Sequence, residues 1–381
     1  MLCNYADAAA LDVIQPYLST RVIHDSNLFR SSPDEGNSEV SETLTHIEAG
    51  IKVRYPVSRQ HFNLDFSINR NQFQRYEFLS HNGNNGQVVW NWEAGNLWQG
   101  DLGYTRSQTL ASFVETQARV RDVRTQQSAF ASANYTLHPD WRLHWGGRWS
   151  DLESGSSRNQ FLNRDETSGV LGVDYISNAD NSLGLEGQLL EARFPESGIT
   201  SASNSDDSYS QVTISSVADW KYSGNSHFRG RFGYTQRRYS ELAARDFNGM
   251  TGRLTYDWSI TGKTLLSVAA WREVGAASDV VSTFAVIKGS SLDVSWFPTS
   301  KIFVRGGFAH KSYDFRGDAG FVLGVIDQRK DDISSFGASV GYNPLHNIEL
   351  SLKGIIEERD STRVGVDYNY KLITADIRIN F

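Results

Sequence analysis

The sequence predicts an all-β protein: a transmembrane, antiparallel, up-and-down β-barrel of about 18 strands with both termini periplasmic. Three observations lead to this fold class. Apolar and polar residues alternate along many segments with the period of an extended strand. Tight turns and longer polar loops alternate between these segments. The last segment alternates in the same way and ends on the aromatic residue Phe381.

The composition excludes several other classes of protein. The 381 residues include 10 Trp, 16 Tyr and 20 Phe, but only 7 Pro and 1 Cys. No run approaches the roughly 18 consecutive apolar residues of a membrane-spanning helix, which excludes a helical membrane protein. The single cysteine excludes a disulfide framework and cysteine-based metal sites. The formal net charge of −7 argues against nucleic acid as a partner, because nucleic-acid-binding proteins usually present a strongly basic face.

The first residues do not share the pattern of the rest. Ala6-Asp7-Ala8 has the small-x-small form of a leader cleavage site, although neither a basic nor an apolar segment precedes it. We therefore assign residues 1–11 to a residual leader or a disordered N-terminus. Residues 12–381 are predicted to form a single outer-membrane β-barrel.

Segment 45–55 shows the alternation clearly. Ile47 and Ile51 fall on one side of an extended strand, whereas Lys52 and Arg54 fall on the other. The same period recurs along the chain and predicts about 18 strands. Their starts are expected near residues 14, 43, 60, 86, 97, 126, 141, 166, 182, 209, 227, 247, 264, 282, 301, 332, 347 and 367.

The connections between these strands alternate in length. Eight are tight and rich in turn-forming residues, and nine are mostly longer and more polar. The tight turns are 56–59, 95–96, 139–140, 178–181, 223–226, 261–263, 298–301 and 344–347. The loops are 25–41, 72–85, 107–125, 153–165, 195–208, 239–246, 276–281, 314–331 and 358–366. This regular alternation predicts a meander with both termini at the tight-turn end.

The length of the strands and the position of the aromatic residues indicate that the apolar face meets lipid. The predicted strands of about 11 to 14 residues exceed those of most soluble proteins and suit a tilted bilayer crossing. Aromatic residues of the apolar side gather beside the tight turns, as they do in the girdle at a membrane interface. The predicted girdle consists of Tyr55, Phe62, Trp92, Trp98, Trp141, Trp220, Phe228, Trp258 and Trp296.

The last strand has the form of a closing strand. Ile373, Ile377, Ile379 and Phe381 alternate with polar residues up to the end of the chain. The segment 368–372 is irregular, because Tyr368, Tyr370 and Leu372 lie on the opposite side from Ile373 onward. A bulge, or a strand that starts above the bilayer, would explain this change.

A β-propeller is the alternative architecture. Nine hairpins in 381 residues give a period of about 42, which falls in the range of four-stranded blades. A blade needs four short strands in each period, however, whereas this sequence offers two long ones. The barrel is therefore favoured.

The charged side of the strands is predicted to line an aqueous interior, because barrels of 16 to 18 strands enclose water. The predicted lumen residues are Lys52, Arg54, Arg142, Arg148, Asp219, Lys221, Arg229, Arg231, Arg237, Arg253, Asp257, Arg305 and Lys311. For any single one of them, the alternative is a cross-strand ion pair that only keeps the wall solvated. Around Arg229, Arg231 and Arg237, the two aspartates of the neighbouring strands are too few to neutralise the arginines. A positive field that favours an acidic sugar chain or small anions is therefore expected there.

No catalytic group, metal site or cofactor site is predicted. The nine histidines are scattered without ligand spacing, and the Gly-Gly pairs precede no helix. The chain is therefore predicted not to be an enzyme. An outer-membrane surface hydrolase with a Ser/His pair in the barrel wall is kept as one alternative, and a general or saccharide-uptake porin as another.

Short motifs lie near both ends of the chain: Pro16-Tyr17-Leu18, the stretch from His24 to Arg30, the stretch from Glu357 to Ser361, and Phe381. These motifs resemble the EpsL-like family of barrels encoded in exopolysaccharide operons, which is often associated with exosortase systems. The resemblance implies an outer-membrane channel that exports an extracellular, biofilm-type polysaccharide. The implied partners are outer-membrane lipid, the polysaccharide, a separate periplasmic polysaccharide-export protein and the barrel-assembly machinery.

Overall fold

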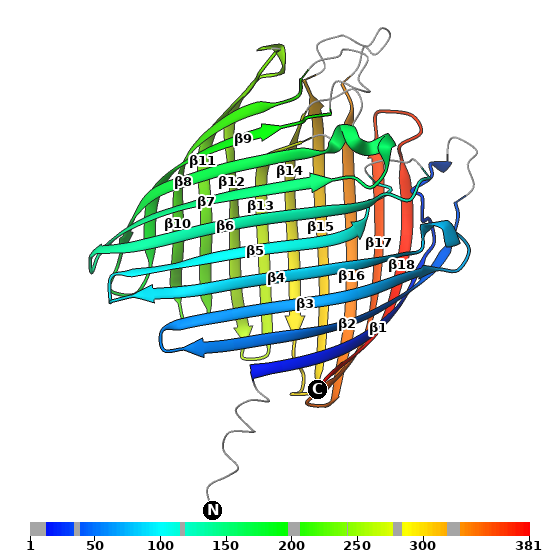
Figure 1. Cartoon of the computed structure of the whole chain (residues 1–381), viewed down its shortest axis with the longest axis horizontal. Coiled ribbons are helices and arrows are strands. Elements are labelled where there is room, and N and C mark those ends of the chain that lie inside the picture. Colours follow the sequence, from blue (N-terminus) through cyan, green and yellow to red (C-terminus); the bar gives the residue numbers. More distant parts are fainter. Residues whose placement is uncertain are drawn as a thin grey trace, which may run out of the picture.

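The chain forms a closed β-barrel. The computed structural model describes residues 13–33, 39–114, 119–196, 206–241, 243–276, 284–317 and 328–381. Its 18 antiparallel strands pair with their neighbours in sequence, and the first strand pairs with the last, so that the sheet has no free edge. Figure 1 shows the resulting ring of tilted strands. The predicted all-β, antiparallel barrel of 18 strands is confirmed, and the periplasmic location of both termini stays a prediction.

The strands alternate with tight turns and longer loops. The strands are β1 (Ile14–Asp25), β2 (Glu42–Val57), β3 (Gln60–Phe73), β4 (His81–Ala94), β5 (Trp98–Leu110), β6 (Val123–His138), β7 (Trp141–Glu153), β8 (Arg164–Ile176), β9 (Ser182–Arg193), β10 (Tyr209–Ser223), β11 (Ser226–Tyr239), β12 (Phe247–Thr261), β13 (Thr264–Ala276), β14 (Phe284–Trp296), β15 (Ile302–Arg316), β16 (Lys330–Leu345), β17 (Ile348–Ser361) and β18 (Tyr368–Asn380). Three short 3-10 helices, η2 (Glu77–Leu79), η3 (Ser157–Leu162) and η5 (Ala243–Arg245), lie in the loops. Among the described residues, no helix is long and apolar enough to cross a membrane.

The two ends of the barrel differ as the sequence predicts. Every predicted strand start lies within five residues of the observed one. The start of β1 and the end of β18 lie at the tight-turn end, where the Phe381 N–H donates to the Pro16 carbonyl at 2.8 Å. Figure 1 shows the C-terminus at this end and the long loops at the other. The predicted leader, residues 1–11, lies outside the described residues, so the extent of the barrel domain at its N-terminus stays a prediction.

The outer face of the barrel carries an apolar belt. Phe66, Leu185 and Ile214 point outward and are 46%, 60% and 66% exposed, which is expected of side chains that meet lipid rather than a protein core. Every residue of the predicted girdle lies on this outer face near the tight turns, and aromatic neighbours pack against several of them. The rings of Phe228 and Tyr256, for example, stack at 4.4 Å. This apolar belt on a closed barrel is that of an outer-membrane protein.

The closing strand β18 contains no bulge. Its register with β17 and with β1 is continuous, so the explanation by a bulge is wrong. Tyr368 and Tyr370 are instead inward-facing residues at the loop end of a regular strand, 2% and 9% exposed. Their rings lie under the guanidinium groups of Arg359 and Arg30 at 4.4 and 3.6 Å. The change of pattern at residue 373 marks the point where the wall passes from the packed loop end to the lipid-facing belt.

Two apolar clusters narrow the interior at the loop end. In the loop cluster, Phe29 of the β1–β2 loop packs edge-on against Phe113 of the β5–β6 loop, with 4.9 Å between the ring centroids. In the hairpin cluster, Phe284 of β14 packs on the inward side chains of Tyr239 and Phe247. The loop cluster consists of Phe29, Val40, Phe73, Leu79 and Phe113, and the hairpin cluster of Ala192, Tyr209, Tyr239, Phe247, Phe284 and Val286.

The hairpin cluster forms where the β12–β13 ladder ends early. This ladder stops at Gly252 and Arg272, whereas the β13–β14 ladder continues to Ala276 and Phe284. The top of the β13–β14 hairpin is therefore free to lean inward. Two arginines bind the carbonyl groups that the shortened ladder leaves unpaired, because Arg272 donates to the Met250 carbonyl and Arg237 to the Val274 carbonyl.

We expect the purified protein to be heat-modifiable. A ring without a free edge has no place from which unfolding can start easily, so the barrel should stay folded in mild detergent and migrate anomalously in a gel until boiled. Gel mobility with and without boiling tests this directly. Identical migration of the two samples would contradict a closed barrel.

Candidate functional site

One contact identifies the inner face of the wall. Arg359 of β17 donates from Nη1 to the Val114 carbonyl of the β5–β6 loop at 3.1 Å. On the shorter way round the wall, β18, β1, β2, β3 and β4 separate these strands, so this contact crosses the interior. Because residues directly opposite each other in paired strands lie on the same face, the strand registers show which residues of the other strands share the inner face with Arg359. All of the charged residues predicted to line the lumen lie on this face: Lys52, Arg54, Arg142, Arg148, Asp219, Lys221, Arg229, Arg231, Arg237, Arg253, Asp257, Arg305 and Lys311.

The arginines of β11 have more acidic partners than the neighbouring strands suggest. Arg229 Nη2 lies 2.6 Å from Asp257 Oδ2 of β12, and Arg231 reaches over β10 to pair with Glu186 of β9. Arg253 Nη2 lies 3.0 Å from Glu273 Oε1 of β13. On this wall, five cationic side chains therefore face four carboxylates. The cations are Lys221, Arg229, Arg231, Arg237 and Arg253, and the carboxylates are Glu186, Asp219, Asp257 and Glu273. Glu186 and Glu273 are not evident as partners from the sequence, because the reach of a side chain across a strand depends on the register.

Arg237 is buried rather than lining open water. It is 2% exposed, and its guanidinium lies 3.9 Å above the ring of Tyr209. Its Nη2 also donates to Gln211 Oε1 at 2.8 Å and to the Val274 carbonyl. Arg237 thus holds the hairpin cluster against the wall.

Several other inward residues fall into paired and stacked groups. Arg142 and His144 both contact the buried Asp174 carboxylate at 2.9 Å, and His144 Nε2 lies 3.7 Å from Glu186. Arg148 donates to Ser128 Oγ at 2.7 Å. A second group stacks on inward aromatic rings, which holds the guanidinium groups in fixed positions. These pairs are Arg148 on Phe130, Arg253 on Trp271, Arg305 on Phe303 and Arg378 on Tyr17.

A recess opens on the described interior beside the seam between β1 and β18. Its volume is about 1030 Å³, and inward residues of β1, β2, β17 and β18 line it near the tight-turn end. Its cationic side chains are Arg21, Lys52, Arg54, Lys353 and Arg378, and its carboxylates are Glu349 and Asp376. Asp65 lies just outside, 3.7 Å from Lys52 Nζ. Even with Asp65 included, five cations face three carboxylates, so the recess has the larger positive excess of the two walls.

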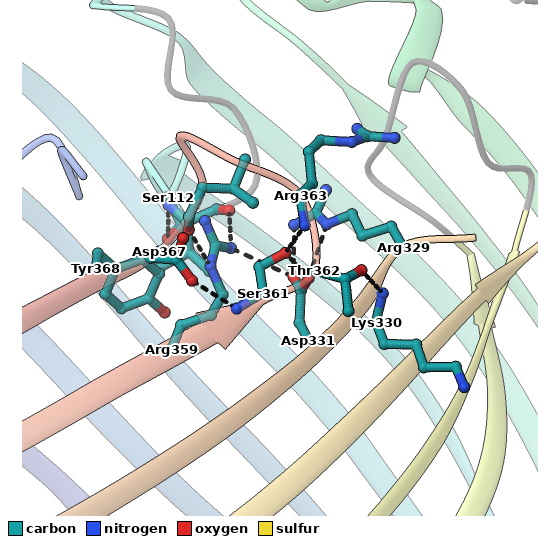
Figure 2. Close-up of polar contacts among 12 residues, drawn as sticks. Ser112, Arg329, Lys330, Asp331, Arg359, Ser361, Thr362, Arg363, Asp367 and Tyr368 are labelled. Carbon is teal, nitrogen blue, oxygen red and sulfur yellow. Dashed lines mark hydrogen bonds and ion pairs between the residues drawn. The ribbon is translucent and has the colours of Figure 1, made fainter. Parts of the chain in front are cut away.

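A buried ionic cluster fastens the β5–β6 loop at the opposite end, as Figure 2 shows. Asp331 of β16 is 1% exposed, and its two oxygens accept from Arg329 at 2.8 and 2.5 Å. Ser361 Oγ donates to the same carboxylate at 2.6 Å, and Arg359 lies 3.9 Å from it. Arg359 also donates to Val114, so this cluster, which we call the latch, ties the loop to the far wall. Arg329, Asp331, Arg359 and Ser361 fall within the predicted loops 314–331 and 358–366, where no alternation indicates a face, so the latch could not be predicted.

The hydrolase alternative has one geometric counterpart, on the outer face. Ser334 Oγ lies 3.1 Å from His310 Nδ1, and Asp332 Oδ1 lies 3.9 Å from His310 Nε2. Acyl transfer also needs donors for the oxyanion. The ladders of β14, β15, β16 and β17 are continuous here, so their backbone N–H groups are already engaged. The arrangement is thus a cross-strand polar contact. Within the described residues, no group of three or more His, Cys, Asp or Glu side chains is placed to hold a metal ion.

Comparisons with known proteins support the fold through structure alone. Neither known protein families nor curated proteins give a sequence match. The outer membrane protein OpdK from Pseudomonas aeruginosa superposes with a TM-score of 0.52 and 12% identity, over 97% of this chain and 100% of that one. OccK2 (OpdF) from the same organism, in complex with glucuronate, gives 0.52 and 10%, over 97% and 98%. A BenF-like porin from Pseudomonas fluorescens Pf-5 gives 0.53 and 10%, over 97% and 99%.

These comparisons correct the family assignment. The resemblance to EpsL-like exopolysaccharide-export barrels is wrong, because the solved structures that share the barrel include a porin and complexes with small molecules, and no family match supports the short motifs. The implied polysaccharide, the biofilm role and the periplasmic export partner are wrong for the same reason. The loop-end clusters give a physical argument, since they narrow the mouth through which a polymer would leave. The closed 18-stranded barrel and its apolar belt confirm the predicted location in the bacterial outer membrane.

Proposed function

We propose that the protein is a passive uptake channel for small anionic solutes, with its long loops outside the cell and both termini in the periplasm. The observation that carries the proposal is the recess at the seam, where five cationic side chains and two side-chain carboxylates surround about 1030 Å³ of open space. A wall with an excess of fixed positive charge concentrates anions and raises their rate of entry. The predicted lumen residues Lys52 and Arg54 belong to this wall.

The size of the solute follows from the loop end. The loop cluster and the latch hold parts of the β1–β2 and β5–β6 loops in the mouth, and the hairpin cluster narrows the opposite wall. A small molecule can pass beside packed segments, whereas a polymer would have to displace them throughout transport. This favours a solute of the size of a sugar acid or an aromatic acid.

The solved structures of similar fold support a carboxylate as the anionic group. OpdK has been crystallised with vanillate and OccK2 with glucuronate, and each of these molecules carries one carboxylate. At 10–12% identity their binding residues do not transfer to this chain. The chemistry that this chain offers to a carboxylate is its own set of lysine and arginine side chains in the recess.

Charge reversal in the recess should change the ion selectivity. In a planar bilayer with a salt gradient, we expect the wild-type channel to prefer anions. The Lys52→Glu/Arg54→Glu variant should shift the reversal potential toward cation selectivity, because it turns a positive excess at the recess into a negative one. Added glucuronate should interrupt the wild-type current more often than that of the variant.

The control changes the same number of charges outside the lumen. Arg238 and Lys371 point outward and are exposed, so Arg238→Glu/Lys371→Glu should leave the reversal potential unchanged. The Arg229→Glu/Arg231→Glu variant should shift it less than the recess variant, since Asp257 and Glu186 already offset those arginines. Cation preference in the wild type, or equal shifts in the lumen and control variants, would refute the proposal.

A further inference from the structure

The outer wall of β2–β5 contains a groove that crosses the upper edge of the apolar belt. The groove has a volume of about 630 Å³. Ile47, Ala49 and Ile68 form its apolar part, and Arg70, Asn82, Asn84 and Gln108 its polar part. These four strands lie side by side on the near face of the barrel in Figure 1.

Arg70 stands where the lipid-facing surface becomes polar. It is the eighth residue after the girdle residue Phe62, and the outward positions between them are Leu64, Phe66 and Ile68. Eight residues of a strand tilted by about 40° rise roughly 20 Å, which is close to the thickness of an apolar belt. The guanidinium is therefore at the height of lipid headgroups, while Ile68 below it, 57% exposed, is at the height of acyl chains.

The charge of this face has one sign. No outward position of β1–β5 carries a carboxylate, and the described contacts give Arg70 no hydrogen bond or ion pair. Arg106, the second outward arginine of these strands, lies beside the groove and donates from Nε to Asn84 Oδ1, a residue of the groove lining, at 3.3 Å. The outer face of β7 and β8 differs, because Asp151, Glu153 and Asp165 lie there. The positive face is thus a local feature rather than a ring around the barrel.

We propose that this groove binds a phosphorylated, multiply acylated glycolipid of the outer leaflet. The exposed Arg70 and, beside the groove, the partly covered Arg106 bind the phosphates, the exposed amide of Asn82 faces the sugar hydroxyls, and an acyl chain lies along Ile47, Ala49 and Ile68. A headgroup with two phosphates fits two arginines on alternate strands better than a headgroup with one. The site lies on the opposite side of the wall from the lumen, so it concerns the anchoring of the barrel and not the choice of solute.

Native mass spectrometry of the detergent-purified barrel with added bis-phosphorylated lipid A tests this site. We expect the wild type to retain the lipid and Arg70→Gln/Arg106→Gln to bind it at least tenfold more weakly. Ala49→Trp, which fills the apolar part without changing the charge, should weaken binding to a similar extent. Arg238→Gln, an exposed outward arginine of β11 on another part of the wall, should bind as the wild type does.

A comparison of different lipids in the same experiment identifies the lipid that occupies the groove. Monophosphoryl lipid A should bind more weakly than the bis-phosphorylated form, and phosphatidylglycerol more weakly still. Equal retention of phosphatidylglycerol, wild-type retention by the double variant, or an equal loss in Arg238→Gln would each overturn the proposal. Heat modifiability shows that each variant is folded. Because the bilayer conductance of Arg70→Gln/Arg106→Gln should stay at the wild-type value, failure of this site is distinguishable from failure of the proposed channel function.

Discussion

Replacing Asp331 with Asn is expected to lower the free energy of unfolding by about 3 to 5 kcal/mol. The carboxylate is the counter-charge of Arg329 and lies 3.9 Å from Arg359, and the side chains of both arginines are less than 10% exposed. An asparagine has the same shape but no negative charge, so the two arginines stay buried without their counter-charge. Removing one partner of a buried ion pair in this way is strongly destabilising. Urea unfolding of the barrel in lipid vesicles, followed by tryptophan fluorescence, measures the change.

Asp360→Asn provides the matched control for this substitution. Asp360 lies beside Arg359 on β17, points outward and is exposed, so the same chemical change should cost less than about 1 kcal/mol there. Loosening the latch should also raise the single-channel conductance of Asp331→Asn, because Arg359 holds the β5–β6 loop across the interior. A stability of Asp331→Asn close to that of Asp360→Asn would show that the latch does not support the barrel.

Placing Arg at position 64 is expected to cost about 2 to 4 kcal/mol. Leu64 points into the lipid near the middle of the apolar belt. A cation at that depth loses its hydration and has no counter-charge to replace it. Asn63→Arg is the control, because the neighbouring side chain points into the polar interior, where Asn63 donates to Asn91 at 2.8 Å. Urea unfolding in vesicles of defined thickness compares the two variants. Similar losses at both positions would mean that the inner and outer faces have been exchanged.

Much of the wall could be predicted from the sequence because each strand repeats a two-residue period. Ile47 and Lys52 fall on opposite faces in the structure, as their spacing requires, and the aromatic girdle lies outward beside the tight turns. The loop end followed no period. Phe29 and Phe113 meet only because two loops fold into the same mouth, and no local pattern in either loop indicates the other.

The sequence predicts which charged residues face the interior, but not which of them pair, because the pairs depend on the register between strands. Spacing places Arg231 on the inner face, but its partner Glu186 is two strands away and becomes a neighbour only through the register of β9, β10 and β11. The inner parity of Tyr368 and Tyr370 indicates aromatic packing inside the barrel rather than a bulge, because the strand register is unbroken. Their arginine partners, Arg359 and Arg30, come from the preceding strand and from the first loop.

The latch also constrains the order in which the barrel is assembled. Arg359 and Val114 are 245 residues apart in the sequence, and the seam pair Arg21 and Asp376 is separated by 355. Hairpins between successive strands can form early from local contacts, but these two connections require nearly the whole chain to be in place. The mouth therefore acquires its final shape after the wall, and an incomplete barrel would be wider and leakier than the finished one. The closed wall is complete only once β18 has paired with β1.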